Sequence, residues 1–156
     1  MDKIYELIDS VNYEFKISNT REYYFSVEQL FEMFSNPEYL KQWFWPKWFT
    51  NTFEKFDFRA NWERTFVMHG PDWVDYQNNC IFLKIVENEF IAREHLSIPN
   101  FQINVRFTKI SENKTKLDFI MLFYERNVFE WVSKFAPEKN EENMDKLDNL
   151  MKKTYL

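Results

Sequence analysis

The sequence is poor in cysteine and glycine, with one of each in 156 residues. A single cysteine, Cys80, cannot form an intramolecular disulfide, and nothing around it indicates an oxidising compartment. The only glycine belongs to Gly70-Pro71-Asp72, a combination typical of a turn. A chain of this length can bury a substantial core without cross-links, and we predict a single domain over residues 1–156.

Long apolar runs are absent as well. No stretch is apolar enough for long enough to span a bilayer, and the segment from Met1 to Glu6 lacks the basic start of a secretory signal. The net charge is -5, and acidic residues interrupt the basic ones, so no basic stripe is present to attract nucleic acid. We expect a cytoplasmic protein that neither spans a membrane nor binds nucleic acid.

Motifs for catalysis and metal binding are also missing. The two histidines, His69 and His95, form no His-x-x-x-His motif, and there is no Cys-x-x-Cys motif. The sequence offers no neighbouring group that would activate Cys80 as a nucleophile. We therefore predict no catalytic residue, no metal and no other cofactor.

The sequence does have regular apolar periodicity. Residues 13–17 alternate between apolar and polar side chains, which predicts a first strand, and the extended pattern can continue through Tyr23-Tyr24. Ser26 has the features of a helix N-cap, because Gln29 follows in the first turn and apolar residues follow at helical spacing. Asn36-Pro37 restarts the chain as a second short helix, which Pro46 ends.

From residue 56 the apolar period changes to two, which predicts antiparallel strands joined by short turns. The clearest alternations run from Phe101 to Phe107 and from Leu117 to Phe123. The C-terminal part is predicted to be helical in two segments separated by Pro137. The first has helical spacing of Val128, Trp131, Val132 and Phe135, and the second carries an apolar stripe made of Met144, Leu147, Met151 and Tyr155. Sheet and helix each have one apolar face, so we predict an α+β fold in which a curved antiparallel sheet wraps around the C-terminal helix.

Several segments, in this order and spacing, resemble those of a known group. They are Ser26-Val27-Glu28-Gln29-Leu30-Phe31, Asn36 to Phe44, Phe56-Asp57-Phe58-Arg59, Tyr76 to Ile85, Arg93-Glu94-His95 and Phe101 to Phe107. The chain is similar to the SRPBCC or START-like superfamily, and within it to the group named after the activator of heat-shock protein 90 ATPase. The resemblance extends over roughly residues 12–155 and implies the helix-grip fold, with two short helices after the first strand.

The resemblance also implies a cavity between the sheet and the C-terminal helix. Its candidate lining residues are Trp62, Phe66, Met68, Phe101, Ile103, Phe119, Met121, Trp131 and Leu147. The alternative is a solid core made of the same residues, because protein interiors pack densely and an empty cavity costs stability. Where the family usually has Pro-Gly-Gly, this chain has Ala60-Asn61-Trp62, and a tryptophan there would narrow the pocket.

The most unusual local feature is the aromatic cluster of Trp43, Phe44, Trp45, Trp48 and Phe49, in which Trp45 and Trp48 lie on either side of Pro46. In a helix-grip protein this region lies near the mouth of the cavity. Rigid aromatic walls at the mouth suit lipids or ring compounds, so the pair would act as a gate for a ligand. The alternative is that the pair simply plugs the open end of the sheet.

Three polar residues are candidate anchors for a ligand. Asp57 and Arg59 lie two residues apart on a predicted strand and share a face, either as a ligand anchor or as a structural ion pair. His95 is the third candidate. Arg93 and His95 also share a face while Glu94 takes the other, so these three residues cannot all enter the cavity as acid–base groups.

Three functions remain open. The first is non-enzymatic binding of a small hydrophobic or amphipathic molecule in the cavity. The second is an interaction module that acts as a chaperone partner in the stress response, as the family name implies, and it needs an exposed surface. The third is a cyclase-like enzyme. A void near Trp62 and Trp131 favours the first function, exposed aromatics around Trp45 and Trp48 favour the second, and a histidine or carboxylate facing the void favours the third.

Overall fold

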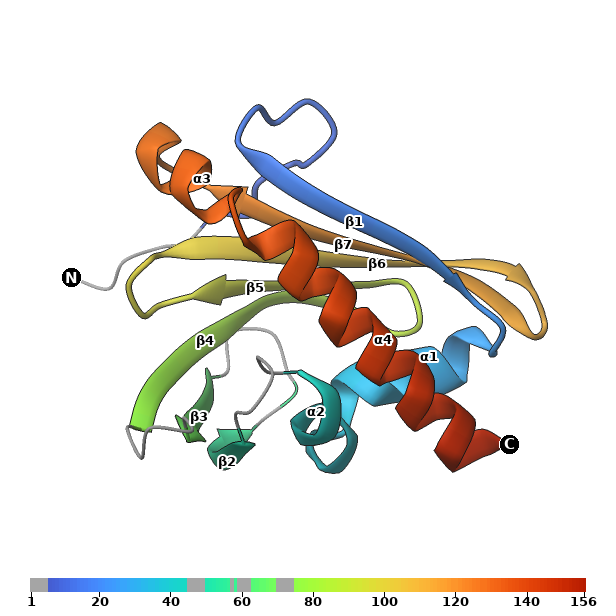
Figure 1. Cartoon of the computed structure of the whole chain (residues 1–156). Coiled ribbons are helices and arrows are strands. Elements are labelled where there is room, and N and C mark those ends of the chain that lie inside the picture. Colours follow the sequence, from blue (N-terminus) through green and yellow to red (C-terminus); the bar gives the residue numbers. More distant parts are fainter. Residues whose placement is uncertain (1–5, 45–49, 57, 59–62, 70–74) are drawn as a thin grey trace.

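The computed structural model describes residues 6–44, 50–56, 58, 63–69 and 75–156 (Figure 1). For residues 50–56, 63–66 and 75–77 the description covers the backbone only. In this part of the chain the elements are β1 (Lys16–Tyr23), α1 (Val27–Ser35), α2 (Pro37–Trp43), β2 (Thr50–Phe56), β3 (Glu63–His69), β4 (Asp75–Val86), β5 (Phe90–His95), β6 (Phe101–Ser111), β7 (Lys114–Phe123), α3 (Arg126–Val132) and α4 (Ala136–Tyr155).

The two short helices begin where the local sequence predicts. Ser26 caps α1: its Oγ accepts a hydrogen bond from the backbone N–H of Gln29 at 3.2 Å, while its own N–H donates to the Gln29 side chain at 3.1 Å. This reciprocal pair satisfies two amide groups that a helix start leaves open. Asn36 ends α1 and caps α2, where Pro37 takes the first turn. Both predicted helix starts are confirmed.

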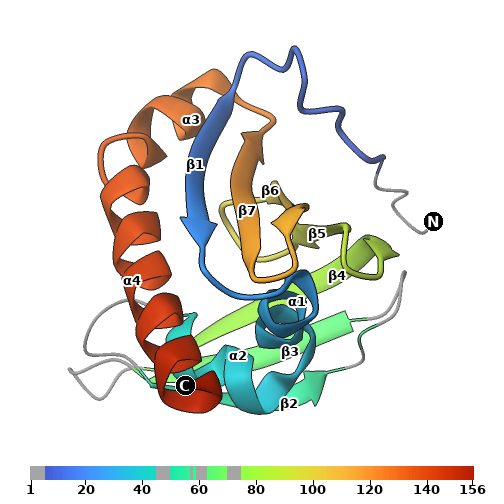
Figure 2. The same ribbon diagram turned by 90° about the vertical axis from the view of Figure 1, so that its right-hand side faces the viewer.

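The described strands form one seven-stranded antiparallel sheet in the order β1-β7-β6-β5-β4-β3-β2. From β2 to β7 each strand pairs with the next along the chain, and β1 adds at the β7 side. The register shifts in three of the pairs, including between Phe82 and Lys84 in β4. Such bulges increase local twist, and the sheet curls around the helices (Figure 2).

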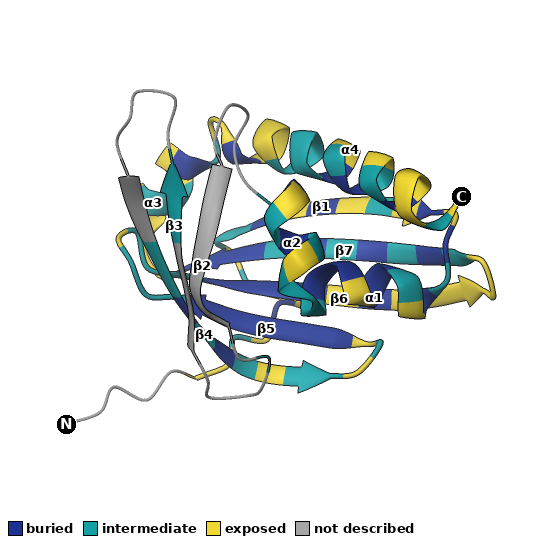
Figure 3. Ribbon diagram, turned by 90° about the horizontal axis from the view of Figure 1, so that it is seen from below, coloured by how far each residue is buried: buried dark blue, intermediate teal, exposed yellow. Residues whose placement is uncertain are grey.

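The helices fill the concave face of this sheet. On β6 and β7, Ile103 lies opposite Met121 and Val105 opposite Phe119, so these side chains share a face. They form one buried cluster with residues of α4, among them the fully buried Leu147. Figure 3 shows α4 with one side buried against the sheet and the other exposed. The prediction that the alternating strands and the striped helix bury their apolar faces against each other is confirmed.

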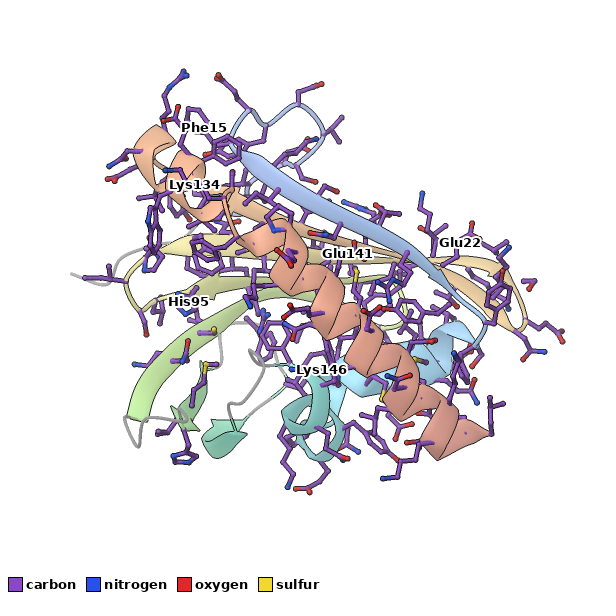
Figure 4. The ribbon with its side chains drawn as sticks, in the orientation of Figure 1. Phe15, Glu22, His95, Lys134, Glu141 and Lys146 are labelled. Atoms are coloured by element: carbon purple, nitrogen blue, oxygen red, sulfur yellow. The ribbon has the colours of Figure 1, made fainter. Side chains whose placement is uncertain are left out.

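Polar side chains join α4 to the edge strand β1. Arg21 Nη2 lies 2.5 Å from Glu141 Oε2, and its Nη1 lies 2.8 Å from Asp145 Oδ1. Asn19 Nδ2 donates to Glu141 Oε1 at 2.9 Å and to the carbonyl of Pro137 at 3.1 Å. Glu141 is labelled on α4 in Figure 4. The hydrogen bond from Asn19, followed by the bond and charge of Arg21, lowers the pKa of the Glu141 carboxyl against the opposing effect of burial.

The convex face is covered by the segment before β1. Residues 6–13 run on the side of the sheet opposite α4 (Figure 2). Gln102 Oε1 accepts from the Ile8 N–H at 3.0 Å, and Asn104 Nδ2 donates to the Ile8 carbonyl at 3.2 Å. Both β6 side chains are buried, with exposed fractions of 0% and 2%. This segment therefore gives the outer face of β6 a cover of its own.

One expected core residue lies outside the core. The side chain of Trp131 is 59% exposed, and its ring packs edge-on against Phe135 with centroids 5.0 Å apart. Helix α3 is short, and its inward position is taken by Val132, which is 4% exposed. Trp131 lies one residue earlier, about 100° around the helix axis. The interpretation of Trp131 as a core residue is therefore wrong.

Among the helices of the described residues, none combines the length and apolarity that crossing a membrane requires.

Candidate functional site

The concave face beneath α4 is closely filled. A small cavity bounded by Phe34, Trp43 and Phe119, with Met144 on α4, has a volume of about 10 Å³. That is room for about one water molecule. The candidates Ile103, Phe119, Met121 and Leu147 all belong to the buried cluster around it. In this part of the described chain the solid-core alternative describes the packing.

The concave face continues beyond α4 across β5, β4 and β3. The strand register places Phe101 opposite His95 and His95 opposite Cys80, so the side chains of this row share one face, and the backbone of Cys80 pairs with that of Arg64. Met68, four residues after Arg64 on β3, has the same parity. Met68, Phe101 and His95 are each partly exposed, whereas Cys80 is 2% exposed. The row therefore offers an incompletely covered apolar surface.

His95 ends β5 on this face (Figure 4). Its ring stacks on Phe101 with a centroid distance of 4.7 Å and an interplanar angle of 18°. Nδ1 lies 3.0 Å from the carbonyl oxygen of Ser97 and 2.9 Å from that of Pro99, and Nε2 lies 3.1 Å from Asn78 Oδ1. Because carbonyl oxygens only accept, Nδ1 must carry a proton. His95 thus holds the 97–99 turn through Nδ1, and its ring, stacked on Phe101, lies on the concave side of the sheet.

Arg93 brings a buried positive charge to the same face. Its side chain is 5% exposed, and its guanidinium carbon lies 4.6 Å from the centroid of the Phe44 ring, a cation–π distance. Phe44 comes directly after α2, so this contact connects the middle of the sheet to the short helices. The strand register puts Arg93 opposite Ile103 and Glu94 opposite Gln102. The prediction that Glu94 takes the other face is confirmed.

Several predicted site residues cannot be placed. Trp45, Trp48, Asp57, Arg59 and Trp62 lie outside the described residues. The gate and plug interpretations of the two tryptophans, and the anchor and ion-pair interpretations of Asp57 and Arg59, stay predictions.

Phe66 is described by its backbone alone, which pairs with Phe53 on one side and with Asn78 on the other.

A polar cluster on the convex face was not predicted from the sequence. Glu94 is fully buried there, and its carboxylate accepts hydrogen bonds from the Tyr124 hydroxyl and from Asn100 Nδ2, which lies 2.7 Å from Oε1. Gln102 Nε2 donates to the same hydroxyl at 2.9 Å. In the sequence these residues occupy the polar positions of alternating strands, which are usually solvated. The only sequence signal for this cluster was that two uncharged amide side chains, Gln102 and Asn104, share one face of a strand.

Comparisons with known proteins agree on the fold. Residues 24–152 match the family model described as Activator of Hsp90 ATPase homolog 1-like protein. No curated protein matches the chain. Similar solved structures include a protein from Arthrobacter aurescens, with a TM-score of 0.82 and 17% sequence identity, covering 90% of this chain and 88% of that one.

Two further structures have the same arrangement. A protein from Nitrosomonas europaea gives a TM-score of 0.80 at 18% identity, covering 88% of this chain and 94% of that one. A protein from Rhodobacter sphaeroides gives 0.82 at 15% identity, covering 90% and 95%. At these identities the likeness establishes the fold alone.

Proposed function

The chain belongs to the family of Activator of Hsp90 ATPase homolog 1-like proteins, which is of the SRPBCC or START-like type, and from this premise we propose that it binds a small hydrophobic or amphipathic molecule without chemical change. The observation that carries the proposal is the uneven cover of the concave face. Beneath α4 this face is filled, whereas Phe101, His95 and, further along the face, Met68 are only partly covered. A ligand lying there would bury apolar area that the chain itself leaves accessible.

The chemistry of the row favours a ligand with an apolar body and one polar end. The stacked pair of Phe101 and His95 would contact the body, and Met68, further along the same face, would be an adaptable contact. Arg93, on the same face as His95, would attract a carboxylate or hydroxyl end. In this proposal Trp45 and Trp48 gate the mouth, Trp62 and Phe66 complete the wall, and Asp57 and Arg59 are further anchors.

The proposal is tested first by native mass spectrometry of protein purified from its own host, in search of a co-purified small molecule. A titration with the fluorescent fatty acid cis-parinaric acid then measures affinity. We expect Phe101→Ala to weaken probe binding by about tenfold, because it removes a stacking wall. Trp131→Ala is the matched control, since it also deletes an aromatic ring, but from an exposed position.

Two results would reject ligand binding on the concave face. One is the absence of saturable probe binding together with a host-purified protein of bare mass. The other is an equal affinity of the Phe101→Ala and Trp131→Ala variants for the probe. Circular dichroism of each variant establishes that the fold is retained.

A second candidate function is that of a chaperone partner. The observation that favours it is the exposed pair Trp131 and Phe135, with exposed fractions of 59% and 41%. Aromatic residues are enriched in protein interfaces. If this function holds, the protein raises the ATPase rate of heat-shock protein 90, and Trp131→Ala reduces the stimulation whereas Phe101→Ala does not. A cyclase-like reaction has less support, because both ring nitrogens of His95 face protein oxygens.

A further inference from the structure

A second hollow lies on the convex side of the sheet, away from α4. It has a volume of about 780 Å³ and is partly open to solvent. Small-molecule sites usually measure about 300–1,000 Å³. We call it the outer hollow, and it is lined by residues of the segment before β1, of the turn between β5 and β6, and of the start of α3. Figure 2 shows that the segment before β1 and α4 lie on opposite sides of the sheet.

The walls of the outer hollow are mainly apolar. Leu7 is 42% exposed and Ile98 is 98% exposed, and Val128 of α3 completes the apolar lining. Large aliphatic side chains that remain this exposed at the rim of a hollow are available to contact a ligand. The walls are therefore suited to a short hydrocarbon chain.

Tyr124 provides the polar floor, and its hydrogen bonds restrict what it can offer. Its hydroxyl donates to Glu94, 2.7 Å from Oε2 and 2.9 Å from Oε1, and accepts from Gln102 Nε2 at 2.9 Å. A hydroxyl has one proton and two lone pairs. The proton and one lone pair are engaged, so only an acceptor position remains. Burial, followed by the bond to Glu94, raises the pKa of the Tyr124 phenol, which keeps this proton in place near neutral pH.

The other lining side chains with N–H or O–H groups are engaged in the same way. Asn100 Nδ2 donates to Glu94 Oε1 at 2.7 Å and to the carbonyl of His95 at 2.6 Å, which uses both of its protons. The Tyr13 hydroxyl donates to the carbonyl of Phe123. In any further hydrogen bond with a ligand, the ligand must therefore donate and the side-chain oxygen must accept.

The charges of the outer hollow also favour a ligand that donates hydrogen bonds. Glu6 and Glu125 line it, and the fully buried Glu94 lies behind its floor. Carboxylates accept hydrogen bonds and attract cations. Lys, Arg and His are absent from the described residues that line the hollow. The lining side chains therefore offer a ligand carboxylate only acceptors and negative charge.

We propose that the outer hollow is a binding site for an organic ammonium ion with a short apolar tail. The ammonium group donates to the remaining lone pair of Tyr124 and to the rim carboxylates, while the tail lies against Leu7, Ile98 and Val128. The Tyr13 and Tyr124 rings add cation–π attraction. This site is separate from the concave face and does not depend on the function proposed for it.

Three probes of equal chain length test the charge requirement: hexylammonium, 1-hexanol and hexanoate. Each is titrated at low salt into isotope-labelled full-length protein, and amide shifts are followed by NMR. We expect hexylammonium to shift the amides of Leu7, Ile98 and Asn100 saturably, 1-hexanol to shift them more weakly, and hexanoate to leave them unchanged. Equal effects of all three probes, or shifts confined to the concave residues Phe101 and Met68, would overturn the proposal.

Two variants and a control locate the site. Ile98→Lys places a positive charge at the rim without disturbing the core, because the side chain is 98% exposed. We expect it to raise the Kd for hexylammonium by about fivefold at low salt. Tyr124→Phe removes the accepting oxygen and should also weaken binding, whereas Tyr24→Phe, at a 74% exposed tyrosine, should not.

An Ile98→Lys protein that binds hexylammonium as tightly as the unchanged protein would show that the amine binds elsewhere. Binding of cis-parinaric acid is measured in parallel on all variants. Loss of hexylammonium binding with the fatty acid retained, or the reverse, separates failure of one site from failure of the other.

Discussion

Leu147 lies at the centre of the face that α4 turns to the sheet, and its side chain is fully buried. We expect Leu147→Ala to lower the free energy of unfolding by about 2–5 kcal/mol, because it removes buried apolar area and leaves a cavity. Trp131→Ala removes a larger side chain from an exposed position and should cost less than about 1 kcal/mol. Urea unfolding followed by circular dichroism measures both changes.

Two outcomes would contradict the predictions for Leu147→Ala and Trp131→Ala. A loss of about 3–5 kcal/mol for Trp131→Ala, the value for a buried tryptophan, would place this ring inside the core after all. A loss below about 1 kcal/mol for Leu147→Ala would mean that α4 is not docked on the sheet through this residue.

At the scale of single residues, the alternation of side chains along a strand predicted which face of the sheet each residue occupies. It placed Arg93 and His95 on one face and Glu94 on the other, as the register confirms. Parity could not predict that Gln102 is buried. A polar residue at an outward position gives the same sequence pattern whether water or another segment of the chain covers it. Its cover comes from Ile8, 94 residues earlier in the sequence.

At the scale of elements, β1 and α4 are joined by a group that responds to pH. The pKa of Glu141 is lowered in the folded protein, so its contribution to stability is present above the ordinary glutamate pKa and is lost as the pH falls through the folded value. We expect the stability difference between the unchanged protein and Glu141→Gln to be largest near neutral pH. It should shrink below about pH 4.3. Urea midpoints measured from neutral to acidic pH test this expectation.

Glu142→Gln is the matched control for Glu141→Gln. Glu142 pairs with Lys139 along the same helix at 3.5 Å, so its substitution leaves the contacts of Arg21 and Asn19 intact. We expect a smaller effect at every pH. If both variants follow the same pH profile, the joint between β1 and α4 is not the origin of the dependence.

The elements themselves were largely predictable because their signals are local. Ser26 and Asn36-Pro37 mark helix starts within a few residues, and the alternation of β6 and β7 is uninterrupted. The orientation of α3 was not predictable. Val128, Trp131 and Val132 are all apolar and at helical spacing, so the sequence does not say which of them faces the core. The packing of neighbouring elements decides which residue remains outside.

At the scale of the whole molecule, one buried cluster joins β6, β7 and α4. It includes Ile103, Phe119 and Leu147, on three separate elements. We expect the backbone amides of these three residues to exchange with deuterium at similar slow rates, because each opens only when the cluster is broken. Hydrogen exchange followed by NMR measures the rates. Exchange of the α4 amides far ahead of the strands would show that the helix detaches on its own.

The place of β1 at one end of the strand order has a consequence for handling the protein in acid. An edge strand offers outward backbone groups that a second molecule can pair with. Here α4 is held at that edge by the hydrogen bonds of Asn19 and the ion pairs of Arg21. When protonation of Glu141 weakens these contacts, the β1 strands of two molecules can pair with each other. Turbidity that grows with protein concentration, rather than reversible melting, would then limit how long the protein survives an acidic buffer.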